Sequence, residues 1–215
     1  MASLINGTNS VLCAELLSLP GFEPVRPRRW VSSRKAPIRE IFEFQALKGA
    51  TYSARWGFSL DFVPLVRNGR VRWKRTPRSA EFDLCIDPID EIGTVPVWCS
   101  FVHIPKVKEA ETTALTRVAA SASTAARRDF DRVQSISDIV AIFRGRTSIS
   151  FRRFSLENYV QTHLAWGLGL IAVGESEQGE AHLKKFCNQQ DLDRELPSIR
   201  KAEREAAKYA AMRTT

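Results

Sequence analysis

The 215-residue chain lacks the long apolar run that a membrane span would need. A helix that crosses a bilayer takes about 20 consecutive apolar residues, and the longest apolar stretch, residues 164–173, is interrupted by Gly167 and Gly169. The first residues show no basic segment followed by an apolar one, which is the pattern of a secretory signal. We therefore expect a cytoplasmic protein with no membrane partner.

Residues suited to catalysis are scarce. The chain has three histidines and four cysteines, none at zinc-ligand spacing, and no glycine-rich phosphate loop. Cys99 and His103 fall on one face of an expected strand, but side chains four apart on a strand are separated by about 13 Å, which excludes a direct dyad. We interpret the histidines as structural and the cysteines as free thiols of a reducing compartment: His103, His163, His182, Cys13, Cys85, Cys99 and Cys187.

The acidic residues near the end of the β-rich region do not form a calcium loop. Asp83, Asp87, Asp90 and Glu91 lack the glycine-turned spacing of such a loop, so we interpret them as a polar connection at the end of a sheet. The sequence therefore predicts no metal and no cofactor, and it favours a protein that is not an enzyme without excluding one.

An alternating pattern typical of an antiparallel sheet runs from Ile38 to Ile86. Phe42 and Phe44 alternate with polar neighbours, residues 58–62 repeat the pattern, and Asn68-Gly69 is a strong signal for a two-residue hairpin. The expected strands are Ile38–Leu47, Thr51–Val63, Arg70–Arg75, Glu81–Ile86 and Thr94–Ile104, after a short strand at Trp30-Val31.

Helical patterns lie on either side of this β-rich region. One short helix is expected at Val11–Ser18, and apolar residues recur every three or four positions from Lys106 onward. Because strands and helices are segregated along the chain, we predict an α+β fold. It would have an N-terminal helix, an antiparallel meander of about five to seven strands, and C-terminal helices packed on the sheet. Residues 1–104 would form the sheet and residues 105–215 the helical part of one globular unit.

Positive charge is concentrated on the expected sheet. The net charge of the chain is +8, yet residues 26–78 alone carry 14 Lys or Arg against three acidic residues, a net charge of +11. Arg70, Arg72 and Lys74 share one strand face if the alternation continues, and Arg-Trp pairs occur at 29–30, 55–56 and 72–73. The candidate binding face comprises Arg28, Arg29, Arg55, Arg70, Arg72 and Lys74.

Three functions are compatible with this pattern. The first is a non-enzymatic binding module that presents the basic face to an acidic protein partner. The second is nucleic-acid binding, with phosphates on the arginines and bases stacked on exposed tryptophans; if the tryptophans are core residues instead, the charges form a solvated outer face. The third is an enzyme without a known motif, for which Asp61, Arg55 and Gln45 are the polar candidates.

The N-terminal part carries motifs of its own. They are Pro20-Gly21-Phe22, Trp30, Phe42-Glu43-Phe44-Gln45 and Gly57-Phe58-Ser59-Leu60-Asp61-Phe62. In these motifs residues 4–90 resemble a bacterial domain family of unknown function. That resemblance implies a structural pattern with no activity and no catalytic residues to carry over. Some bacterial domains of this size are immunity or defence components, which agrees with a binding module.

Overall fold

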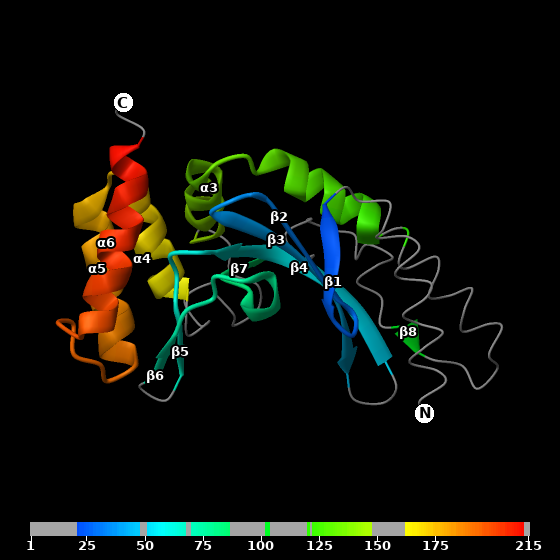
Figure 1. Cartoon of the computed structure of the whole chain (residues 1–215), viewed down its shortest axis with the longest axis horizontal. Coiled ribbons are helices and arrows are strands. Elements are labelled where there is room, and N and C mark those ends of the chain that lie inside the picture. The colour runs from blue at the N-terminus through cyan, green and yellow to red at the C-terminus, as the bar shows by residue number, and fades with distance from the viewer. Residues whose placement is uncertain are drawn as a thin grey trace. The chain divides into compact units, whose positions relative to one another are not determined.

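The computed structural model has an α+β fold in which an antiparallel sheet precedes a set of helices (Figure 1), as the sequence predicts. It describes residues 21–47, 51–67, 70–86, 102–103, 120, 122–147 and 162–212. The predicted N-terminal helix and the predicted boundary after residue 104 lie outside these residues. None of the helices in the described part is long and apolar enough to cross a membrane.

The strands are β1 (Phe22–Arg26), β2 (Arg29–Lys35), β3 (Ile38–Leu47), β4 (Thr51–Leu60), β5 (Leu65–Arg67), β6 (Arg70–Arg72), β7 (Leu84–Ile86) and β8 (Val102–His103). The helices are the 3₁₀ turn η1 (Pro77–Ser79), α3 (Ile136–Thr147), α4 (Thr162–Ala172), α5 (Ser176–Gln189) and α6 (Pro197–Ala211), and residues 122–132 are also helical.

The larger sheet is a meander with the order β1-β2-β3-β4-β7, and β8 pairs antiparallel with the start of β4. A two-residue turn joins β1 to β2, with Arg26 opposite Arg29. Strands β5 and β6 form a separate two-stranded sheet. By contacts the chain groups into two compact units, which we call the sheet unit (residues 1–34, 40–57 and 85–132) and the helical unit (residues 35–39, 58–84 and 133–215).

The core of the sheet unit is a cluster of aromatic rings, in which Trp30 meets Phe42 edge-on and Phe42 stacks on Trp56. Trp30, Phe42 and Trp56 lie on the neighbouring strands β2, β3 and β4. The ring centroids of Trp30 and Phe42 are 6.3 Å apart, and those of Phe42 and Trp56 are 6.2 Å apart. All three side chains are fully buried. The indole N–H of Trp56 donates to Asp129 Oδ2 at 2.9 Å, and Phe130 packs on Phe22 at 5.4 Å. Helical residues 122–132 therefore contact both β4 and β1.

The helical unit is built around α4. Every residue of α4 is buried, because α3, α5 and α6 all pack against it. The helix ends in a Schellman motif: Gly174 adopts a left-handed φ of 93°, and Glu175 N–H donates to the carbonyl of Leu170 at 2.9 Å. At the start of α3, Asp138 N–H donates to Ser135 Oγ at 3.3 Å while Asp138 Oδ2 accepts from Ser135 N–H at 2.8 Å. This reciprocal cap fixes where α3 begins.

Candidate binding surface

Two of the predicted binding arginines are occupied within the sheet unit. Arg29 is only 7% exposed, and its Nε donates to Glu43 Oε2 at 2.5 Å. Arg55 Nη2 donates to the other oxygen, Oε1, at 2.8 Å. Arg28 is half-buried in the β1–β2 turn, where it adopts a left-handed φ of 62°. Glu43 therefore links β2 and β4 across β3, and Arg29 and Arg55 serve the packing of the sheet.

Removing the Glu43 charge is expected to destabilise the protein. In the Glu43→Gln variant the buried Arg29 guanidinium loses its ion pair with Glu43, at a cost of about 2 kcal/mol in the free energy of unfolding. Urea unfolding measures this, and Glu23→Gln is the matched control because Glu23 is exposed on β1. Equal stability of the two variants would show that the Glu43 bridge contributes nothing.

The other predicted cations lie on and after the β5–β6 hairpin of the helical unit. Leu65, Val66 and Arg67 pair with Arg72, Val71 and Arg70, which confirms a hairpin with a two-residue connection. Arg70 and Arg72 are both exposed, and Val71 between them is half-buried. Neither arginine makes an ion pair with any residue in the part of the chain that the structure describes.

Lys74 does not share this exposed face, although strand parity predicts that it should. Strand β6 ends at Arg72, so the alternation does not extend to residue 74. The Lys74 side chain is 1% exposed and forms a buried ion pair with Asp83. Asp83 also accepts a 2.7 Å hydrogen bond from Leu60 N–H. Lys74 is thus a core residue and is removed from the candidate surface.

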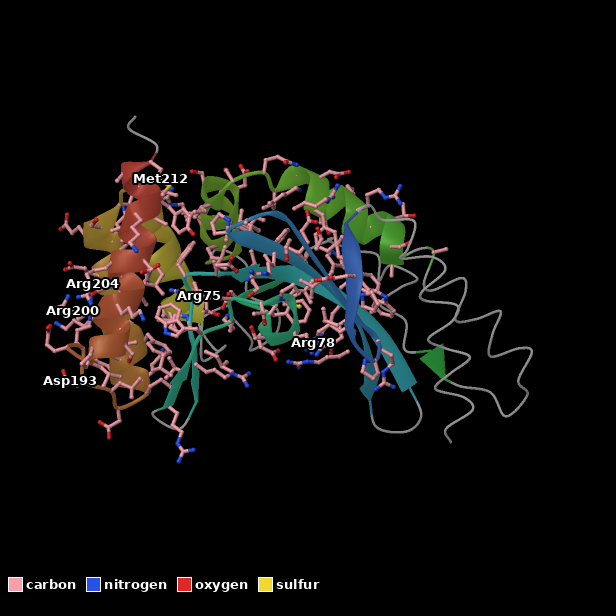
Figure 2. All side chains as sticks on the ribbon, viewed as in Figure 1. Arg75, Arg78, Asp193, Arg200, Arg204 and Met212 are labelled. Carbon is pink, nitrogen blue, oxygen red and sulfur yellow. The ribbon has the colours of Figure 1, made fainter. Side chains whose placement is uncertain are left out.

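Two further cations, one in the segment after β6 and one on α6, surround Trp73, and strand patterns did not reveal them. The Arg75 guanidinium lies 4.3 Å from the centroid of the Trp73 ring, and Lys201 Nζ of α6 lies 5.4 Å from the same centroid. Arg75 also pairs with Glu205 at 3.4 Å. Figure 2 shows Arg75 on the side of α6 opposite Arg200 and Arg204. We call Arg70, Arg72, Arg75 and Lys201 the basic hairpin surface.

Arg39 holds the segment that carries Trp73 and Arg75. Its guanidinium donates to the carbonyl oxygens of Lys74 at 3.2 Å and Arg75 at 2.7 Å, and it forms an ion pair with Asp61. These contacts fix the backbone where it leaves β6. The basic hairpin surface is therefore presented on a supported segment rather than on a loop held by its ends alone.

Those polar groups considered for catalysis or metal binding that the structure describes are engaged in ion pairs. Asp61 pairs with Arg39, Arg55 pairs with Glu43, and the side chain of Gln45 lies outside the described residues, as do residues 87–91. Among the described residues no three His, Cys, Asp or Glu side chains are placed to hold a metal ion. Cys85 and Cys187 are free thiols; Cys13 and Cys99 lie outside the described part.

Two of the histidines meet between α4 and α5, a contact that their separation in the sequence does not reveal. His163 Nδ1 and His182 Nδ1 are 2.9 Å apart, so one nitrogen donates and the other accepts. The ring centroids of Trp166 and His182 are 4.0 Å apart. The side chain of His163 is buried, with only 2% of the residue exposed. The pair belongs to the core of the helical hairpin.

Comparison with known proteins gives no relative from which a function can be carried over. No protein-family model, no curated protein and no solved structure matches the chain. The resemblance of residues 4–90 to a bacterial domain family therefore stays a prediction, and the geometry of the basic hairpin surface is the basis for assigning a function.

Proposed function

We propose that this protein is a non-enzymatic binding module that holds an acidic protein partner on the basic hairpin surface. The observation that carries the proposal is that Arg70 and Arg72 are exposed without an ion pair to any described residue. Elsewhere in the helical unit, exposed Arg144 and half-buried Arg200 have carboxylate partners, whereas exposed Arg204 has none among the described residues. Unpaired guanidinium groups are suited to bidentate bonds with carboxylates of a partner.

A protein partner is favoured over single-stranded nucleic acid because the four tryptophans that the structure describes are not available for stacking. Trp30 and Trp56 are fully buried, and Trp166 is 7% exposed. Trp73 is half-buried and already contacts two cations. Sequence-tolerant binding of single strands depends on exposed rings that stack on bases. The surface retains the charge that such binding needs, but among the described residues no fully exposed tryptophan accompanies it.

Charge reversal tests the proposal. Immobilised wild-type protein and the Arg70→Glu/Arg72→Glu variant are incubated with nuclease-treated lysate of the source cells, and retained proteins are identified by mass spectrometry. We expect a retained acidic partner whose recovery falls at least about tenfold in the variant, because attraction becomes repulsion. Lys74 is left unchanged because it is buried.

The matched control is Lys184→Glu/Lys185→Glu, which makes the same charge change on the exposed side of α5. This variant should retain the partner as the wild type does, and circular dichroism should show that both variants are folded. Identical protein sets for all three forms would exclude the proposal. Binding of a fluorescent single-stranded oligonucleotide that weakens steeply with salt would favour nucleic acid instead.

A further inference from the structure

The outer edge of β6 offers backbone groups next to the exposed arginines. Hydrogen-bonded and non-hydrogen-bonded pairs alternate along an antiparallel ladder, and Arg67 and Arg70 form the pair beside the two-residue connection. Val71, one position further along, therefore directs its N–H and C=O away from β5. No described residue hydrogen-bonds to these two groups.

We propose, on the basis of the function above, that the partner supplies an extended acidic segment that adds to β6 as a third strand. The backbone of the added segment would bond to Val71, as in other complexes formed by strand addition. Arg70 and Arg72 lie on one face, two residues apart. Carboxylates on one face of the added strand must likewise be two residues apart, because side chains alternate.

The geometry thus specifies an acidic–apolar–acidic sequence in the partner. The middle residue lies on the face of half-buried Val71, where an apolar side chain packs, and the flanking carboxylates meet Arg70 and Arg72. A second copy of this hairpin does not fit the same edge, because its own arginines would add positive charge to the arginines already there. Charge complementarity therefore selects an acidic segment as the occupant.

The test uses a fluorescent peptide, Gly-Ser-Glu-Val-Glu-Ser-Gly, titrated against the full chain and followed by anisotropy. A peptide of the same composition with adjacent glutamates, Gly-Ser-Glu-Glu-Val-Ser-Gly, carries equal charge but puts its carboxylates on opposite faces. Strand addition predicts weaker binding of the second peptide. It also predicts that Arg70→Glu/Arg72→Glu abolishes binding of the first, while Lys184→Glu/Lys185→Glu does not.

N-methylation of the peptide backbone separates strand addition from simple charge attraction. Methylation of the valine should weaken binding at least about tenfold if the added strand is antiparallel, because its N–H then donates to Val71. Methylation of the second glutamate should do so if the strand is parallel. Methylation of the first glutamate, whose N–H points away from β6 in both arrangements, is the control.

Two results would overturn strand addition without touching the proposed function. One is equal binding of all methylated peptides, and the other is no binding of any peptide while the lysate partner is still captured through Arg70 and Arg72. Failure of the proposed function has a different signature, which is partner capture that survives reversal of both arginines.

Discussion

The Lys74→Met variant is expected to be less stable than the wild type by about 3–5 kcal/mol, because it leaves a buried carboxylate without its counter-charge. Lys74 and Asp83 are each 1% exposed, so both charges are buried in the folded protein. Methionine has a similar length and fills the same space, so the loss reports the charge rather than a cavity. Urea unfolding followed by circular dichroism measures the change.

A second substitution distinguishes this electrostatic cause from damage to packing. Adding Asp83→Asn to Lys74→Met removes the uncompensated charge and keeps an acceptor for Leu60 N–H, so the double variant should recover most of the lost stability. Lys184→Met, on the exposed side of α5, should change stability by less than about 0.5 kcal/mol. A double variant no more stable than Lys74→Met would refute the charge explanation.

The stability of the Lys74→Met variant should also depend on pH in a defined direction. Burial raises the pKa of Asp83, and Lys74 is the main influence that opposes the rise. A carboxyl whose pKa is higher in the folded state contributes stability below its unfolded pKa of about 3.9, and this contribution is lost as pH rises through the folded value. Without Lys74 the folded pKa rises further. The deficit of the variant should therefore be smaller at about pH 4.5 than at about pH 8.

The sequence predicts the antiparallel sheet and the hairpin because these depend on local patterns, but it does not predict that the hairpin forms a separate sheet while β7 pairs beside β4. Alternation in residues 38–47 and the Asn-Gly signal correspond to β3 and to the β5–β6 hairpin. The predicted end of a strand is wrong where a contact with a residue distant in the sequence determines it. The carbonyl oxygens of Lys74 and Arg75 accept hydrogen bonds from the Arg39 guanidinium. They are therefore not available for strand pairing, and the predicted strand Arg70–Arg75 ends at Arg72. No local pattern contains that interaction.

The candidate surface was predictable only in part, for the same reason. The charge excess of residues 26–78 correctly points to Arg70 and Arg72 as exposed cations. It does not indicate that Arg29 and Arg55 share Glu43, or that Lys74 is buried with Asp83. Lys201 joins the surface from a helix more than 120 residues away in the chain. Counting charges finds where cations are, but only the fold shows which of them lack a partner.

Gly167→Ala is expected to destabilise the protein by about 3 kcal/mol, because α4 and α5 approach too closely to admit a methyl group. A Cβ at Gly167 would lie 2.8 Å from the carbonyl oxygen of Gly179, and a Cβ at Gly179 would lie 2.6 Å from Ile171 Cγ1. The first contact involves backbone, so side-chain rotation cannot relieve it and the two helices must separate. Thermal and urea unfolding both measure the loss.

Gly145 supplies the matched control, because it lies within α3 and a Cβ there would meet no atom within 4 Å. Gly145→Ala should raise the free energy of unfolding by up to about 1 kcal/mol, as expected for the better helix former. The double variant Gly167→Ala/Gly179→Ala should lose less stability than the sum of the single variants, because either methyl group already separates the helices. A Gly167→Ala variant as stable as Gly145→Ala would mean that α4 and α5 can separate without a loss of stability. The close approach of the two helices would then not contribute to the stability of the helical unit.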